Sequence, residues 1–258
     1  MRLIGRTILI TGGSAGIGLA FALKFLELGN EVIVTGRRQA VLDEVKARYP
    51  ALHTIRGDVA DPAQVAAVAA QVKADFPGLD VLMNNAGIGI PTNLREPASK
   101  LGGLMAEMDV NVGGVIRMTS ALVDILTANK GTVINVSSQL AFAPVPALAI
   151  YSATKAAVHS YTQSLRFQLE ENGVEVIELM PPAIETDMTS EFPEEVSKIT
   201  TDELVRQTFA ALKAGKLEIR PGQTNQVAFM RRLAPEFLNR QLWRASKGMV
   251  PVGEGISR

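Results

Sequence analysis

The chain has 258 residues, of which 26 are basic and 26 acidic, and it contains no cysteine. This length suits one large domain with a sizeable core, and the balanced charge gives no global field that would attract nucleic acid or an anionic membrane. The absence of cysteine excludes disulfides, thiolate zinc sites and cysteine nucleophiles, and we expect no metal site. The N-terminus lacks the order of a signal peptide, so we expect a cytoplasmic location.

One uncharged stretch, from Gly131 to Thr154, is long enough to suggest a membrane span. It contains Asn135, Pro144 and Tyr151, and polar side chains of this kind are costly in hydrocarbon. We therefore interpret the stretch as a buried strand, a loop and the start of a helix.

Short β-branched runs alternate with longer helical runs, a pattern typical of βαβ units and a parallel sheet. The predicted strands are 7–11, 31–35, 53–56, 79–83, 132–136 and 174–180, and the predicted helices are 17–28, 39–48, 62–75, 106–127, 151–171 and 202–214. A long loop, a short apolar run and a mixed tail occupy 183–200, 217–220 and the remaining residues. We predict a single α/β domain, 1–258, with a Rossmann-type doubly wound parallel sheet and a substrate lid at about 187–200.

A glycine-rich turn, Thr11-Gly12-Gly13-Ser14-Ala15-Gly16-Ile17-Gly18, lies between the first predicted strand and the first predicted helix. Glycines let the main chain approach a pyrophosphate, whose charge is stabilised by the helix N-terminus. The alternative is an ordinary strand-to-helix turn. We assign dinucleotide binding to Gly12, Ser14, Gly16, Ile17 and Gly18.

The end of the second predicted strand bears on the choice of cofactor. It carries Arg37 and Arg38 where an acidic residue would bind a ribose 2′-hydroxyl. Guanidinium groups offer planar, bidentate donors that suit a 2′-phosphate. The sequence therefore favours NADP(H), with NAD(H) as the alternative, unless the arginines simply cover a solvated helix start.

The turns after the third and fourth predicted strands would line the same crevice, at the carboxyl ends of the strands. Asp58 and Val59 could reach an adenine ring, and Asn85, Ala86 and Gly87 leave room for adenosine. Taken singly, Asp58 could be a helix cap and the asparagine a turn residue.

Tyr151 and Lys155 are four residues apart and would share one face of a helix. An ammonium group beside a phenol favours the phenolate, so the pair could lower the pKa of Tyr151 and let it transfer protons near neutral pH. On its own, a pair at this spacing usually does no more than share a surface.

The glycine turn, Asn84–Gly87, Asn111, Ser137-Ser138 and Tyr151-x-x-x-Lys155 fall in an order that makes the chain resemble short-chain dehydrogenases/reductases of the short, single-domain branch. The resemblance covers about residues 5–187. Within this family the chain is most similar to DltE-like bacterial oxidoreductases, on residues 7–18, 29–37 and 218–222. The resemblance to the family implies an NAD(P)-dependent enzyme that acts on CH–OH or C=O groups.

The resemblance also implies a role for each catalytic residue. Tyr151 would be the acid in carbonyl reduction and the base in alcohol oxidation, and Lys155 would lower its pKa and bind the nicotinamide ribose. Ser138 would bind the substrate oxygen; Ser137 is the competing candidate, and the spacing to Tyr151 favours Ser138. Asn111 would hold a water that links Lys155 to a proton relay.

The family's Pro-Gly after the sixth strand is Pro181-Pro182 in this chain. A second proline removes an N–H and fixes φ, so we expect the backbone beside the nicotinamide to differ locally. The span still matches the family at Pro181, Ile184 and Thr186, which the resemblance places at the nicotinamide.

The candidate substrate residues are mostly apolar and follow strands four to six: Ile88, Ile90, Gln139, Leu140, Val145, Ile184, Met188 and Phe192. They offer no obvious anchor for a carboxylate or phosphate, which favours a small apolar ketone, aldehyde or secondary alcohol. In relatives the helices matching 106–127 and 151–171 pack between subunits, which implies a homodimer or homotetramer. The alternative function is a non-catalytic NAD(P)-binding sensor or scaffold on the same fold.

Overall fold

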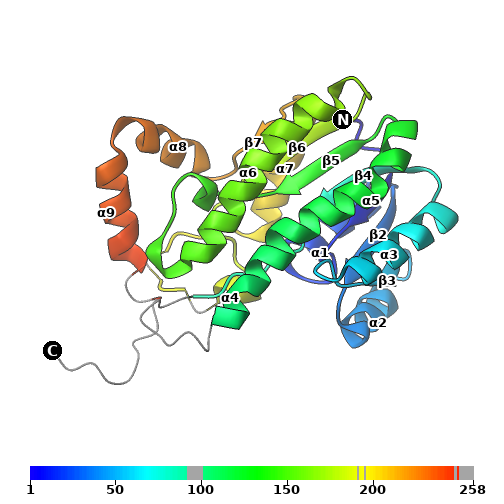
Figure 1. The fold of residues 1–258 in the computed structure, drawn as a ribbon, viewed down its shortest axis with the longest axis horizontal. Coiled ribbons are helices and arrows are strands. Elements are labelled where there is room, and N and C mark those ends of the chain that lie inside the picture. The colour runs from blue at the N-terminus through cyan, green and yellow to red at the C-terminus, as the bar shows by residue number, and fades with distance from the viewer. Residues whose placement is uncertain (92–100, 191, 195, 247–248, 250–258) are drawn as a thin grey trace.

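The computed structural model describes residues 1–91, 101–190, 192–194, 196–246 and 249. These residues form a parallel sheet of seven strands in the order β3-β2-β1-β4-β5-β6-β7, with helices on both faces (Figure 1). The strands are Thr7–Ile10 (β1), Glu31–Gly36 (β2), His53–Arg56 (β3), Leu79–Asn84 (β4), Thr132–Val136 (β5), Glu175–Leu179 (β6) and Glu218–Ile219 (β7). The predicted doubly wound α/β fold is confirmed.

The helices that follow these strands have clear bounds in the described residues. They are Gly16–Glu27 (α1), Gln39–Arg48 (α2), Pro62–Asp75 (α3), Leu101–Met108 (α4), Gly114–Ala128 (α5), Ala149–Glu170 (α6), Thr201–Lys213 (α7), Thr224–Leu233 (α8) and Pro235–Ser246 (α9). Strand order reverses between β1 and β4, and ligands bind at such a switch point, outside the carboxyl ends of the strands.

Apolar residues of the strands alternate between the two faces of the sheet, because successive side chains of a strand point in opposite directions. Ile8 and Ile10 pack with α1, α2 and α7, whereas Leu9 packs with α3, α5 and α6. Both faces are therefore buried, as expected for a parallel sheet whose strands read as continuous apolar runs.

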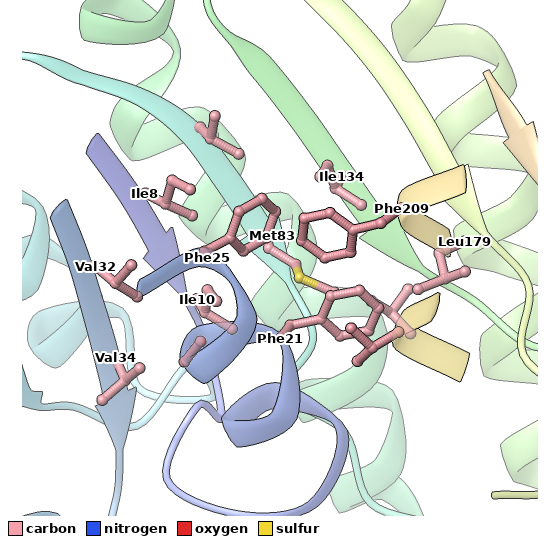
Figure 2. Packing of buried hydrophobic residues seen from close by; sticks show 14 of the residues in the cluster. Ile8, Ile10, Phe21, Phe25, Val32, Val34, Met83, Ile134, Leu179 and Phe209 are labelled. Atoms are coloured by element: carbon pink, nitrogen blue, oxygen red, sulfur yellow. The ribbon is translucent and has the colours of Figure 1, made fainter. Parts of the chain in front are cut away.

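Aromatic packing joins α1 to α7, which are far apart in the sequence. The ring of Phe209 lies 4.8 Å from the ring of Phe25 and 6.2 Å from that of Phe21, centroid to centroid (Figure 2). This contact fastens α7, the helix that follows the predicted lid segment, to the first βα unit.

The long helix predicted at 106–127 is interrupted. A π-helical turn, Asp109–Gly113, separates α4 from α5, and α4 begins at Leu101. Such turns occur mostly within α-helices and often at functional sites, and the sequence carries no proline or charge pattern that would have marked this one.

One described helical run, Met105–Ala128, is long and apolar enough to cross a membrane by length and composition alone. Its residues Met118, Leu122 and Leu126 are buried in the core on one face of the sheet. We interpret the run as a core helix, since such helices pass the same test.

The prediction of a mixed tail after residue 220 was wrong. It contains two helices, α8 and α9, which lie together at one side of the molecule, beyond the β7 end of the sheet (Figure 1). Apolar residues recur with a helical period in both segments, and the prediction of an irregular tail overlooked this signal.

Candidate active site

A cavity of about 690 Å³ opens at the carboxyl ends of the strands. The glycine turn lines it through Gly12, Ser14, Gly16 and Ile17. The ends of the next strands contribute Arg37, Arg38, Asp58, Val59, Asn85, Ala86 and Gly87. The structure thus brings together nearly all of the residues that the sequence assigns to a dinucleotide.

The glycine turn has the shape of an anion-binding loop. Gly12 and Gly16 adopt φ values of +64° and +51°, and a Cβ atom at Gly12 would lie 2.9 Å from Ala86 Cα. Helix α1 begins after Ala15, which supplies no side-chain cap to the first N–H groups. These groups are therefore available to a phosphate.

Gly18, which the sequence assigns to the dinucleotide, is not among the residues that line the cavity. A Cβ atom there would lie 2.4 Å from the carbonyl oxygen of Gly12 and 2.5 Å from Asn85 Nδ2. Gly18 therefore permits close packing between α1 and the turn, and contacts no space open to a ligand.

The two arginines after β2 lie beside the turn. Arg37 Nη1 is 3.9 Å from Asp58 Oδ2, and the Arg37 side chain is 59% exposed. Asp58 also accepts a hydrogen bond of 2.9 Å from the N–H of Ala60, so it acts as a turn residue as well. The guanidinium groups of Arg37 and Arg38 remain accessible at the cavity, where they could hold a 2′-phosphate.

Tyr151, Lys155 and Ser138 line the same cavity. Lys155 Nζ donates a hydrogen bond of 2.8 Å to the carbonyl oxygen of Val136 and lies 5.5 Å from the centroid of the Tyr151 ring. Ser138 Oγ accepts a hydrogen bond of 3.1 Å from the N–H of Leu140 and donates one of 3.5 Å to the carbonyl oxygen of Pro181.

Ser137, the competing candidate, also lines the cavity, but its hydroxyl is engaged elsewhere. Ser137 Oγ donates a hydrogen bond to the buried carboxylate of Glu178, on β6. Of the two serines, Ser138 is the one whose hydroxyl acts on Tyr151, where it lowers the pKa against the effect of burial.

The side chains around Tyr151 do not lower its pKa, which differs from the expectation based on the Tyr–Lys spacing. Burial raises the pKa of Tyr151 to about 12; the hydrogen bond from Ser138 opposes this shift, and the negative charge of Glu107 adds to it. Burial also lowers the pKa of Lys155 to about 8. Desolvation disfavours the charged form of both groups, and it outweighs their mutual attraction.

Asn111 is fully buried in the π-helical turn and does not line the cavity. Its Oδ1 accepts a hydrogen bond of 2.8 Å from the N–H of Ile88, and its Nδ2 donates to Ile88 O at 2.8 Å and Thr154 Oγ1 at 3.0 Å. The side chain thus joins the segment after β4 to α6, and both hydrogens of its Nδ2 are engaged in these contacts.

The substrate candidates Ile88, Gln139, Leu140, Val145, Ile184, Met188 and Phe192 line the cavity. Ile90 does not: its N–H donates a hydrogen bond of 2.9 Å to the buried Glu107 Oε1. The turn after β6 is held by the carbonyl oxygen of Pro181, which accepts a hydrogen bond of 2.9 Å from the N–H of Gln139.

The lining residues that the sequence analysis missed include a C-terminal set, Gln223, Leu242, Ser246 and Met249. They come from the residue that precedes α8, from α9 and from the segment that follows α9. Leu238, Leu242 and Ser246 recur every four residues, and this period was the available signal for a helix facing the site.

The predicted lid is anchored at both ends. Ile184 and Ile199 form a β-bridge, and the N–H of Glu185 donates a hydrogen bond of 3.0 Å to the carbonyl oxygen of Ile199. Between them, Lys198 Nζ donates a hydrogen bond of 2.7 Å to the carbonyl oxygen of Thr189. Residues 191 and 195 of the lid lie outside the described residues.

The family model of the short chain dehydrogenases matches residues 6–197. Among curated proteins, "Uncharacterized oxidoreductase DltE" of Bacillus subtilis is 38% identical over 224 residues, which is 85% of this chain and 89% of that protein. The predicted resemblance to DltE-like oxidoreductases is therefore confirmed.

Solved structures agree with this relationship. A short chain dehydrogenase from Burkholderia cenocepacia in complex with NADP is 30% identical, with a TM-score of 0.83 over 94% of this chain and 99% of that chain. A short chain dehydrogenase/reductase from Burkholderia phymatum in complex with NAD is 25% identical, with a TM-score of 0.78 over 92% and 96%. The chain belongs to the short-chain dehydrogenase/reductase family and is an NAD(P)-dependent oxidoreductase that acts on CH–OH or C=O groups.

Proposed function

We propose that the protein transfers a hydride between NADP(H) and a small apolar ketone, aldehyde or secondary alcohol. The observation that carries the proposal is one cavity lined by the glycine turn, by Arg37 and Arg38, and by Tyr151 with Lys155. A proton-transferring group and a dinucleotide site in one cavity are what a carbonyl reductase requires.

The residues present fit a dinucleotide. The uncapped N-terminus of α1 and the left-handed glycines suit a pyrophosphate, and the accessible arginines suit the extra phosphate of NADP(H). When bound, the nicotinamide supplies or accepts the hydride, and the protein supplies position and the proton. Both NADP and NAD occur in related structures, so the preference for NADP(H) rests on Arg37 and Arg38.

The remaining chemistry belongs to side chains at one end of α6 and β5. Tyr151 donates its phenolic proton to the oxygen of a carbonyl being reduced, and Ser138 donates a hydrogen bond to the same oxygen as charge develops there. Lys155, which is mostly charged at pH 7 with a pKa of about 8, stabilises the phenolate that remains. Asn111 holds the segment that carries Ile88 against α6.

The substrate class follows from the apolar side of the cavity, which includes Ile88, Leu140, Val145 and Met188. Apolar walls favour a small ketone, aldehyde or secondary alcohol over a strongly charged substrate. We infer a cytoplasmic homodimer or homotetramer, with no nucleic-acid or membrane partner. A non-catalytic NAD(P)-binding sensor on the same fold is the second candidate, and it is favoured only if no carbonyl is turned over.

The test is a panel of ketones, aldehydes and secondary alcohols assayed with NADPH, NADH and their oxidised forms. We expect loss of NADPH absorbance with an apolar carbonyl, and Tyr151→Phe should lower kcat by a factor of about a thousand, because proton transfer and substrate orientation are both lost. NADPH binding should survive in the variant. An active Tyr151→Phe enzyme would contradict the assignment, and tight NADPH binding without any turnover would favour the sensor.

A further inference from the structure

A carboxylate that the proposed reaction does not use lies directly behind the catalytic residues. Glu178, on β6, is fully buried, and it accepts hydrogen bonds from Ser137 Oγ and from His159 Nδ1, the latter at 2.8 Å to Oε2 and 3.0 Å to Oε1. A buried carboxylate is costly unless it is paired, and Ser137 and His159 supply that pairing for Glu178.

The two partners of Glu178 belong to the two elements that carry the proposed chemistry. Ser137 precedes Ser138 at the end of β5, and His159 follows Lys155 by four residues on α6. Tyr151, Lys155 and His159 are spaced by four, so they share one stripe of the helix. Glu178 therefore bridges the end of β5 to the helix stripe that holds the proton donor.

The charges around this bridge favour a protonated histidine. Hydrogen bonding to Glu178 raises the pKa of His159; burial opposes the shift, Glu218 on β7 adds to it, and Arg220, just after β7, opposes it. Glu218 is itself paired with Arg220 Nη2 at 2.7 Å and lies 3.8 Å from Arg166 Nη1 on α6. The Nε2 atom of His159 lies 3.2 Å from Gln163 Nε2 on the same helix.

We propose that Glu178 is a positioning residue that, through Ser137 and His159, fixes Ser138, in the segment just after β5, relative to Tyr151 and Lys155 of α6. The inference deepens the proposed function, on which its kinetic part rests. No atom of Glu178 touches the substrate; the carboxylate acts by holding two catalytic elements in one geometry. Small displacements of reacting groups reduce rates strongly, so the effect should fall on kcat.

The test uses the full-length chain with Glu178→Gln, which keeps the shape of the side chain but removes the charge and replaces one acceptor oxygen with an NH2 donor. Glu175→Gln is the matched control, since Glu175 lies on the same strand and pairs with the N-terminal amine. We expect Glu178→Gln to lower kcat for carbonyl reduction by about tenfold or more, with little change in NADPH affinity. The control should retain the kinetics of the wild-type protein.

A second measurement needs no turnover. The chain has 2 histidines, so NMR titration with the variant His53→Gln assigns the His159 signal and its pKa. We expect this pKa to fall in Glu178→Gln, and we expect crystal structures with NADPH to show Ser138 Oγ displaced from the Tyr151 hydroxyl.

Two results would overturn the inference. One is an unchanged kcat in Glu178→Gln although the pKa of His159 has fallen; the other is an unchanged separation of Ser138 and Tyr151 in the crystal structures. A wild-type protein that reduces no carbonyl would instead refute the proposed function, and the separation in the crystals would still decide the role of Glu178.

Discussion

At the scale of single residues, the site combines a phenol and an amine whose pKa values burial shifts in opposite directions. Tyr151 is shifted up to about 12 and Lys155 down to about 8, so both neutral forms are favoured relative to water. Near pH 7 the phenol holds its proton, which suits a group that donates a proton to a carbonyl. The same shift makes alcohol oxidation, which needs a base, depend on alkaline conditions.

The lysine should set the alkaline limit of carbonyl reduction. Because its pKa is lowered to about 8, Lys155 loses its charge as pH rises through that value, and the phenolate formed at Tyr151 loses its stabilising ammonium. We expect kcat/KM to fall above about pH 8. In Lys155→Arg the guanidinium does not titrate in this range, so the alkaline decline should move upward by a unit or more even if the rate is lower. An identical pH profile for the two proteins would assign the decline to another group.

The two arginines after β2 should determine cofactor preference. Replacing both, as Arg37→Ala with Arg38→Ala, removes charge-assisted hydrogen bonds worth about 1.5–3 kcal/mol each, so KM for NADPH should rise by roughly tenfold or more. The KM for NADH should change little, since that cofactor has no 2′-phosphate. Arg48→Ala, at the far end of α2, is the control. Equal losses for the two cofactors would show that the arginines do not bind the phosphate.

At the scale of elements, the helices that carry the site are held by a few long-range contacts. Helix α7 starts at Thr200, whose Oγ1 accepts a hydrogen bond of 3.1 Å from the N–H of Glu203, and its Phe209 enters the core beside α1 (Figure 2). The predicted lid segment is thus followed directly by a capped helix, α7, and the Phe209 side chain of this helix is buried against α1.

Removing that aromatic ring should destabilise the whole domain. Phe209→Ala deletes a side chain that is 5% exposed and packs on Phe21 and Phe25, so the free energy of unfolding should fall by about 3–5 kcal/mol. Urea unfolding followed by circular dichroism measures the change. Phe167→Ala, at a position that is 74% exposed on α6, should stay within about 0.5 kcal/mol of the wild type. A small loss at Phe209 would mean that α7 docks through other contacts.

The sequence was informative where periodicity or a motif was strong. Strand β5 and helix α2 match their predicted bounds, because continuous β-branched runs and a proline or glycine stop mark them clearly. The π-helical turn around Asn111 was not predictable, since its cause is tertiary: the side chain reaches both Ile88 and Thr154. The shifted pKa values were also out of reach, because spacing shows which groups are neighbours but not how deeply they are buried.

At the scale of the whole molecule, large apolar side chains lie exposed on the helices that the family resemblance places between subunits. Phe167 on α6 is 74% exposed and Ile116 on α5 is 42% exposed. Apolar groups of this size on one pair of helices favour association, whereas scattered ones need no explanation. We therefore expect the protein to be an oligomer that uses α5 and α6.

A charge placed on this surface should weaken the assembly. Phe167→Glu puts a carboxylate in the expected contact, so light scattering coupled to gel filtration should show a smaller species than the wild-type protein does. Phe237→Glu, at a position that is 56% exposed on α9, is the matched control and should keep the wild-type mass. The reverse pattern would place the interface on the C-terminal helices.

Because α8 and α9 lie apart from the cofactor turn, mutations that alter the substrate side of the cavity and mutations that alter the cofactor side fall in different parts of the chain. The cofactor turn and the proposed proton donor lie before residue 190, whereas Gln223, Leu242, Ser246 and Met249 close the cavity from the last part of the chain. Mutations in α8 and α9 can therefore change which substrates enter the cavity. The residues proposed for hydride transfer stay unchanged by such mutations. Divergence among such proteins should accumulate first in the codons of α8 and α9.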